Sequence, residues 1–405
     1  MSATPSTEFP RRSRRLLFAA TAAVFHACAP SDDPAPQAIQ RDSAGISIVE
    51  SFGPAWGDSA RWYVDPEPLL DLAESGTGDP HNFYFVRGIR RLSDGSLVVA
   101  NQGSNEIRKF SADGRFLASA GGDGEGPGEF SNLQQIERVG DSIIARDIRS
   151  RIALFGPGLE HLRTTRLEDY ARNLHHLRDE TLVVQAIMDF AEVYGVVRSP
   201  EALVLYDLEG VRGDSIGSTP GGEEYVAEVL SAPPLFQKEA LVDTYEGRIY
   251  TGASDRMQVE ELTPDGDTVR ILRIPDFPLA LTPQQVEAER SARLDIALPQ
   301  GVASLPPHFV QAIEDMPSPE TRPAYAALLV DPTGAIWLRP FRGLSEAGGP
   351  VQWLVLGPDG NWLGSVEIPE DFRVMDIGAD EVLGVWTDEM DVPHPQVRRL
   401  LRGGG

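Results

Sequence analysis

The sequence predicts an all-β fold, and within that class a six-bladed β-propeller whose N-terminal strand closes the last blade. Three observations predict this fold. From about residue 60, apolar and polar residues alternate with period 2 between glycine turns, which is typical of strands. Two segments repeat each other at a constant offset of 47 residues, close to the length of one blade. The first hairpin turn of such a unit recurs six times along the chain.

The repeat is clearest in the first two units. Leu69–Leu92 and Phe116–Val139 have equal lengths and align without a gap. Each segment has a proline, a phenylalanine and an isoleucine at matching positions, and an aspartate at the turn that follows the strand. The matched pairs are Pro80 and Pro127, Phe83 and Phe130, Ile89 and Ile136, and Asp94 and Asp141.

The turns within the units predict hairpins. Asp-Gly between apolar alternations favours a tight hairpin because both residues tolerate positive φ. Consecutive hairpins make a four-stranded antiparallel meander, which is one propeller blade. The first turns of the six units lie near Asp94, Asp141, Asp179, Glu246, Thr333 and Asp380.

The two ends of the repeat region complement each other. Trp62–Leu72 resembles the last strand of a blade that has no earlier strands, and the C-terminal unit Arg373–Leu400 is one strand short. We therefore expect Trp62–Leu72 to pair with the segment near Val397. Such closure removes the edge strands that promote aggregation.

One segment interrupts the strand pattern. Thr282-Pro283-Gln284-Gln285 has the capping-box pattern of a helix start, with proline at the first helical position. A second short helix is expected at Phe309–Asp315, after Pro306-Pro307. Residues 282–323 are therefore predicted to form a helical insertion between the fourth and fifth blades.

The N-terminus has the features of an export signal. Four arginines precede a ten-residue apolar stretch, Leu16–Phe25, which is too short to span a bilayer. Phe25-His26-Ala27-Cys28 resembles a bacterial lipobox, in which a small residue precedes the cysteine that receives the lipid. Residues 1–28 are predicted to be a lipoprotein signal peptide with lipidation at Cys28, 29–45 a disordered tether, and 46–402 the propeller.

Composition limits the partners. The formal net charge is -25, from 36 basic and 61 acidic residues. Because such an acidic surface repels phosphate backbones, we expect no nucleic-acid partner. Cys28 is the only cysteine, which excludes an intramolecular disulfide and a multi-cysteine zinc site.

The Gly-rich sequence Gly124–Phe130 is followed by an apolar strand and an aspartate turn, and Gly78–Phe83 is a degenerate counterpart of it. With these segments the units resemble NHL-like six-bladed β-propeller lipoproteins of bacteria. The resemblance covers roughly residues 60–400. It implies the fold but no particular chemistry, because propellers include binding proteins, lyases and hydrolases.

Several polar residues in or beside apolar strands are candidates for a ligand site in the central channel. An arginine in such a strand can project into a channel and bind carboxylates or sugars, or it can pair with an acid of the next blade. A tryptophan there can line the channel or pack in the core. The candidates are Arg87, Asn101, Arg146, Asp147, Arg339, Trp386, Asp388 and His394.

Two motifs give little support for catalysis. Gly121–Gly128 is rich in glycine, but it lacks the lysine and helix of a phosphate loop, and its acids do not have the spacing of an EF-hand calcium site. Gly213–Gly217 matches G-x-S-x-G, but the residues after it would break the helix that a nucleophile elbow requires. Catalytic and metal-binding residues therefore stay unassigned, with no cofactor expected beyond a possible Ca²⁺ or other divalent ion.

The sequence thus predicts an exported lipoprotein, periplasmic or at the cell surface and anchored to a membrane through its lipid. The expected function is a monomeric binding or scaffold module for a small molecule, an envelope protein or a glycan. The alternative is an enzyme, either a metal-dependent hydrolase of the lactonase kind or a lyase, with its site in the central channel.

Overall fold

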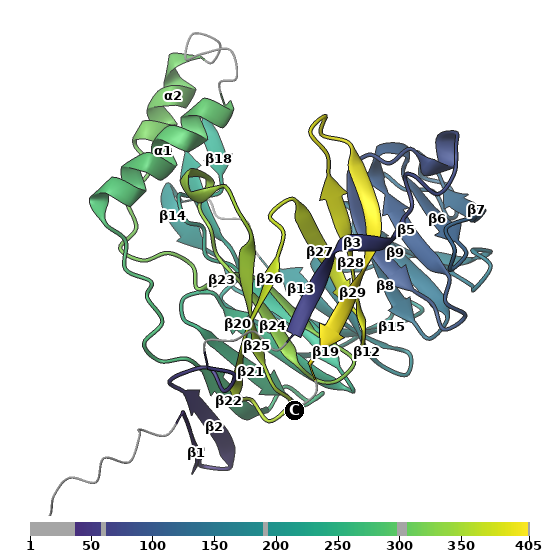
Figure 1. Cartoon of the computed structure of the whole chain (residues 1–405). Coiled ribbons are helices and arrows are strands. Elements are labelled where there is room, and N and C mark those ends of the chain that lie inside the picture. Colours follow the sequence, from purple (N-terminus) through teal and green to yellow (C-terminus); the bar gives the residue numbers. More distant parts are fainter. Residues whose placement is uncertain (1–36, 58–61, 189–192, 298–305, 404–405) are drawn as a thin grey trace, which may run out of the picture. The chain divides into compact units, whose positions relative to one another are not determined.

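The chain is built almost entirely from strands (Figure 1). The computed structural model describes residues 37–57, 62–188, 193–297 and 306–403. The predicted signal peptide with Cys28 lies outside the described residues. No helix in the described ranges is long and apolar enough to cross a membrane.

Six antiparallel units of four strands make up most of the described chain. The first four units are β4–β7, β8–β11, β12–β13–β15–β16 and β19–β22. Their bounds are β4 Val86–Arg91, β5 Leu97–Asn101, β6 Glu106–Phe110 and β7 Phe116–Gly121; β8 Leu133–Val139, β9 Ser142–Asp147, β10 Arg151–Phe155 and β11 His161–Arg166; β12 Tyr170–Arg178, β13 Thr181–Ile187, β15 Glu201–Asp207 and β16 Arg212–Thr219; and β19 Ala240–Tyr245, β20 Arg248–Ala253, β21 Gln258–Leu262 and β22 Thr268–Arg273.

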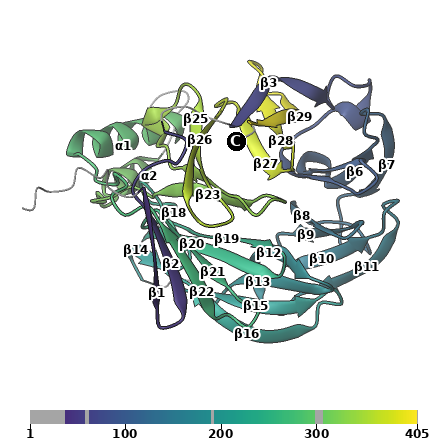
Figure 2. The same cartoon turned by 60° about the horizontal axis from the view of Figure 1, so that its bottom comes forward.

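The last two units are β23–β26 and a sheet of order β27-β28-β29-β3. In the first five units the strands run outward in chain order, which Figure 2 shows for β8 to β11 and for β19 to β22. The bounds are β23 Tyr325–Val330, β24 Ile336–Pro340, β25 Val351–Leu356 and β26 Trp362–Ile368, then β27 Phe372–Ile377, β28 Glu381–Thr387, β29 Pro393–Arg402 and β3 Trp62–Asp71.

All six predicted first turns join the first two strands of a unit. Gly95 (φ 82°) and Gly247 (φ 73°) supply the positive φ that these tight turns require. Non-glycine residues do so elsewhere, as at Asp179 (φ 45°). Local turn chemistry therefore sets where each meander begins.

The strand that precedes the first unit, β3, completes the C-terminal sheet, as predicted. β3 pairs antiparallel with β29, with Leu70 opposite Val397 and Val64 opposite Leu400. The guanidinium of Arg402 stacks over the Trp62 ring at 4.2 Å from its centroid. Chain ends separated by more than 300 residues are thereby joined in one sheet.

The core lies between neighbouring sheets. Six clusters of buried residues each join two consecutive units, and one of them joins the last unit to the first. In that cluster Leu383 and Val397 of the last unit pack with Val86 and Ile89 of the first. The apolar face of every sheet is thus covered by the next one, and the series of units closes on itself.

Two helices lie between β22 and β23: α1 (Pro283–Ala297) and α2 (Pro307–Glu314). The predicted capping box is present, because the Gln285 N–H donates to Thr282 Oγ1 (3.3 Å) and the Thr282 N–H donates to Gln285 Oε1 (2.9 Å). Before these helices, β14 (Gly195–Arg198), β17 (Glu223–Ala227) and β18 (Leu230–Ala232) form a three-stranded sheet that the repeat did not predict.

The tether prediction for residues 29–45 is wrong in its second half. Ala38–Ser43 forms β1, which pairs with β2 (Ile46–Ser51), and β2 adds in parallel to β22. β1 is almost fully exposed, so its residues lack the apolar alternation that marks a strand in sequence. Main-chain pairing to β2 holds it instead.

Candidate functional site

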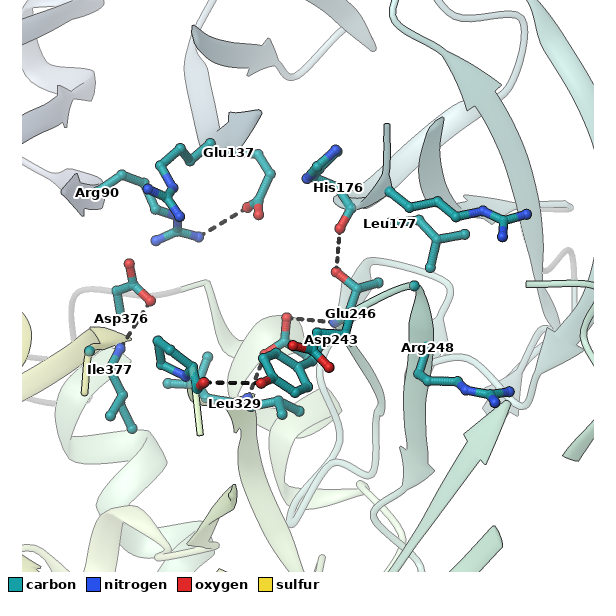
Figure 3. Close-up of a pocket in the computed structure, with 18 of the residues that line it drawn as sticks. Arg90, Glu137, His176, Leu177, Asp243, Glu246, Arg248, Leu329, Asp376 and Ile377 are labelled. Carbon is teal, nitrogen blue, oxygen red and sulfur yellow. Dashed lines mark hydrogen bonds and ion pairs between the residues drawn. The ribbon is translucent and has the colours of Figure 1, made fainter. Parts of the chain in front are cut away.

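A pocket of about 1020 Å³ opens where the innermost strands of the sheets end. Residues of all six units line it, which places it on the axis that the units surround. The volume is at the upper end of the usual range for small-molecule sites. Its lining combines apolar side chains such as Leu329 and Ile377 with charged ones from several sheets (Figure 3).

Arg90 and Glu137 form the polar centre of this pocket. Arg90 Nη2 lies 3.1 Å from Glu137 Oε2, and Arg90 Nη1 also donates to the Met375 carbonyl (3.1 Å). Burial tends to lower the pKa of Arg90, but the nearby carboxylates of Glu137, Asp376 and Asp243 raise it overall. Arg90 is therefore a fixed positive charge that faces three acids.

Asp376 is the acid that is least compensated. Its carboxylate accepts the N–H of Ile377 (3.0 Å), and it has no side-chain donor in the described structure. Desolvation raises its pKa, and the charges of Glu137 and Asp243 raise it further against the opposing effect of Arg90. Figure 3 shows Asp376, Arg90 and Glu137 facing the same space.

Asp243 lines the pocket as well, and His175 lies behind it, outside the lining. Asp243 Oδ2 accepts the Val330 N–H (2.7 Å), and Asp243 Oδ1 lies 3.6 Å from His175 Nδ1. His175 Nε2 is buried and has no hydrogen-bond partner. Arg91, Arg138, Arg178 and Arg248 also line the pocket, but Glu137, Asp243 and Asp376 all act on Arg90, so this part of the pocket favours a ligand that brings positive charge or hydrogen-bond donors.

Two of the predicted channel residues, Arg87 and Arg339, lie together at the end of the sheets that is away from this pocket. Arg87 is near the start of β4, and its Nη2 donates to Gln102 Oε1 (2.8 Å). Burial, together with the positive charges of Arg87 and Arg339, lowers the pKa of Arg373 at the start of β27. The structure therefore gathers three arginines at that end.

Three other predicted residues hold the framework. Asn101 is fully buried, and its Oδ1 accepts the Tyr84 N–H (2.7 Å). The Asp147 carboxylate accepts the N–H groups of Arg149 (2.9 Å) and Arg151 (3.0 Å) and so fixes the turn after β9. Arg146 is the third of these residues.

Arg146 joins the second unit to the third. Its Nη1 donates to the Ala171 carbonyl (3.0 Å) and its Nη2 to the Arg172 carbonyl (2.7 Å), both at the start of β12. Burial lowers its pKa to about 10. Both Nη nitrogens of Arg146 thus donate to main-chain oxygens, which gives this arginine a structural role between the two units.

Trp386, Asp388 and His394 come together, but on the outer side of the last unit. His394 Nδ1 lies 3.0 Å from Asp71 Oδ2, its Nε2 lies 3.7 Å from Asp388 Oδ2, and its ring packs on Trp386 at a centroid distance of 5.0 Å. Asp71 belongs to β3 and His394 to β29, the two outer strands of the sheet.

This outer cluster has a donor set that suits a cation. One ligand atom each from Asp71, Glu74 and His394 lies within 4.8 Å of the others, the single such group found among the described residues. Asp71 Oδ2 already accepts Gln396 Nε2 (2.7 Å). The existing hydrogen bonds satisfy Asp71 without an ion, so the main role of the cluster is to join β3 to β29.

The glycine-rich segment and the G-x-S-x-G match both have structural roles. Gly121–Gly128 forms the connection between β7 and β8, where Glu125 pairs with Arg149 and Glu129 Oε2 accepts the Gly126 N–H (2.8 Å). Gly213–Gly217 lies within β16, so Ser215 is on a strand and not on a nucleophile elbow.

The charged centre of the pocket was missed by sequence reasoning, although the repeat contained the signal. Arg90 and Glu137 are separated by the same 47 residues as Ile89 and Ile136. Residues one repeat apart on inner strands occupy equivalent places around the axis. Aligning the charged residue after each matched apolar position would have found this pair.

Comparisons with known proteins give the fold and not the chemistry. No protein-family model matches the chain, and no curated protein is similar to it in sequence. A protein from Bacteroides fragilis described as a candidate exported protein is similar in structure, with a TM-score of 0.52 and 12% identity over 88% of this chain and 100% of that one. A member of the DUF4221 family from Bacteroides vulgatus also has a TM-score of 0.52, with 11% identity over 84% of this chain and 99% of that one.

Proposed function

We propose that this protein is an exported binding module, a closed six-bladed propeller that holds a small cationic or amine-bearing ligand in its channel pocket. The single observation that carries the proposal is the excess of carboxylates at the pocket centre. Glu137, Asp243 and Asp376 share Arg90 as the cation nearest to all three, and the pKa of Asp376 is raised by burial and by the neighbouring acids.

The chemistry follows from the cost of these charges. A carboxylate that is taken out of water with only one main-chain donor is unfavourable, and a ligand ammonium group that reaches it restores the lost interaction. Arg90 already neutralises Glu137, so Asp376 is the acid left for the ligand. The apolar lining, including Leu329 and Ile377, would cover the rest of a compact molecule.

Export supports a role in capturing ligands outside the cytoplasm. The Arg-rich leader with its lipobox and the likeness to a Bacteroides protein described as a candidate exported protein both favour that location. We expect a palmitate analogue to label the wild-type protein in cells. A Cys28→Ala variant should lose the label and leave the membrane fraction, whereas a variant that stays labelled would refute lipidation at this cysteine.

The ligand class can be tested with matched probes. We expect putrescine and glucosamine to raise the Tm of the purified chain and to give saturable heats in titration calorimetry. Glucose, which has no amine, and gluconate, which is an anion, should do neither. Binding of gluconate in preference to glucosamine would overturn the proposed charge preference.

Variants connect binding to the pocket. Asp376→Asn should weaken glucosamine or putrescine binding by about tenfold or more, the usual consequence of losing a charged hydrogen bond. The matched control is Glu367→Gln, which removes one acid from an exposed position on β26 and should leave binding unchanged. Equal losses in both variants would mean that net charge, and not the pocket, governs binding.

A further inference from the structure

A second pocket of about 300 Å³ lies near the other end of the inner strands. Tyr325 begins β23 and lines this second pocket, whereas Val330 ends the same strand and lines the large one. Helix α1 contributes Glu289 and Arg293, and the segment after β18 contributes Phe236. The two pockets therefore open at opposite ends of β23.

Arg339 is the unusual residue of this pocket. It is half-buried on β24, and desolvation lowers its pKa with no carboxylate near enough to oppose the shift. It forms no hydrogen bond or ion pair with any other described residue. A guanidinium stays charged at neutral pH, so this desolvated charge is without a counterion.

The other charged groups that line the pocket already have partners. Arg293 donates to the carbonyls of Pro233 and Pro234. Glu289 Oε2 accepts the Ser345 N–H (3.0 Å). Glu239 Oε1 lies 3.2 Å from an Arg172 nitrogen, which balances its charge.

Arg342 is satisfied in the same way, since its donors go to the carbonyls of Glu346, Gly348 and Gly349. Arg339 is thus the lining cation whose five N–H donors remain for a ligand.

Neighbouring charges strengthen the preference for an anion. Burial lowers the pKa of Arg373, and Arg87 and Arg339 lie close enough for their charges to lower it further. Arg87 donates to Gln102 and Arg373 to the Val86 carbonyl (2.8 Å), so neither is neutralised by an acid. In a chain with 61 acids and 36 basic residues, such a group of arginines forms a positive region within an acidic surface.

The walls indicate the body of the ligand. Phe236, Tyr325 and Phe341 line the pocket, and the ring centroids of Phe236 and Phe341 lie 5.8 Å apart with their planes tilted by 50°. Aromatic side chains in the lining suit an aromatic body, and the planar fork of a guanidinium matches the two oxygens of a carboxylate. We propose that this pocket binds a small aromatic carboxylate, with Arg339 as the residue that pairs with its carboxylate group.

This proposal does not depend on the proposed ligand of the large pocket, so the experiments can contradict one proposal without contradicting the other. The probe is fluorobenzoate, whose binding to the purified chain is followed by ¹⁹F NMR, with fluorobenzamide as its neutral analogue. We expect saturable binding of fluorobenzoate and at least about tenfold weaker binding of fluorobenzamide. No binding of fluorobenzoate, or equal binding of the two probes, overturns the proposal.

Variants locate the binding. Arg339→Gln should weaken fluorobenzoate binding at least about tenfold, and Arg339→Lys should weaken it less, because a lysine keeps the charge but loses the bidentate geometry. Arg115→Gln removes the same charge from an exposed turn between β6 and β7 and is the matched control, with unchanged binding expected.

A stability measurement excludes a purely structural role. Because Arg339 has no partner in the fold, Arg339→Gln should leave the Tm unchanged or raise it. Unweakened fluorobenzoate binding in this variant would contradict the proposal. A lowered Tm together with weakened binding would also contradict it, because it would assign Arg339 to the framework.

Discussion

At the scale of single residues, the ionised carboxylate of Asp376 is costly for stability but is the group proposed to bind the ligand. Its carboxyl group is held beside Glu137 and Asp243, and burial raises its pKa. A raised folded-state pKa means that the folded protein binds this proton more tightly than the unfolded chain does. The protonated Asp376 carboxyl group therefore contributes its full stabilisation of the folded state below the unfolded-state pKa. This contribution is lost as the pH rises through the folded-state pKa.

Replacing Asp376 by asparagine should consequently stabilise the protein at pH 7. We expect the Tm of Asp376→Asn to exceed that of the wild type by a few degrees at pH 7. The difference should shrink as the pH falls through the raised folded-state pKa, since the wild-type carboxyl group is then neutral as well. Thermal unfolding followed by circular dichroism at several pH values measures this.

The exposed acid Glu367 supplies the control, because Glu367→Gln should change the Tm little at any of these pH values. An Asp376→Asn protein that is less stable than the wild type at pH 7 would show that the carboxylate makes a net favourable contact with Arg90.

Residue types alone predicted the site only in part. The sequence suggested Arg87 and Arg339, which do gather at one end of the inner strands, but it also suggested Arg146 and Asp147. All four are charged residues in or beside strands. Whether such a group meets a carbonyl, a turn N–H or open space depends on the neighbouring sheet, which the local pattern does not contain.

At the scale of elements, the join between β3 and β29 determines whether the sheets close. Along β29 the side chains alternate between the two faces, so Leu400 is buried (2% exposed) and Leu401 is exposed (47%). Leu400 packs in a cluster with Val64 of β3 and Trp337 of β24. The chemistry of these two leucines is identical, and only the register separates them.

This pair gives a matched test of the register. Leu400→Ala should lower the free energy of unfolding by about 2–5 kcal/mol, the usual cost of a cavity left by a buried leucine. Leu401→Ala should change it by less than about 0.5 kcal/mol. Guanidinium unfolding curves measure both, and similar values for the two variants would show that the register of β29 differs from the one described.

The elements that the sequence failed to predict share a cause. β14, β17 and β18 form a sheet outside the repeat, and β1 is nearly all exposed. The six main units could be predicted because a buried sheet requires period-2 apolar residues and because tight hairpins require particular turn residues. Strands held mainly by main-chain pairing leave neither signal.

At the scale of the whole molecule, the net charge of -25 opposes the compact state. Most arginines of the described residues are paired, but many of these ion pairs are partly exposed, as for Arg149 with Glu125 and Arg163 with Glu209. Exposed pairs contribute little, typically between about 0 and 1 kcal/mol each. The unpaired excess of acids therefore repels over distances comparable to the protein itself.

Salt should consequently stabilise this protein. Raising NaCl from about 10 mM to about 100 mM shortens the Debye length from about 30 Å to about 10 Å, which screens the repulsion between distant acids more than the contacts within ion pairs. We expect the Tm to rise by a few degrees over this range, and glucose at the same osmolality to have no comparable effect. A Tm that falls with added NaCl would instead mean that the ion pairs between neighbouring sheets, such as Arg90 with Glu137 and Arg91 with Glu381, outweigh the net repulsion.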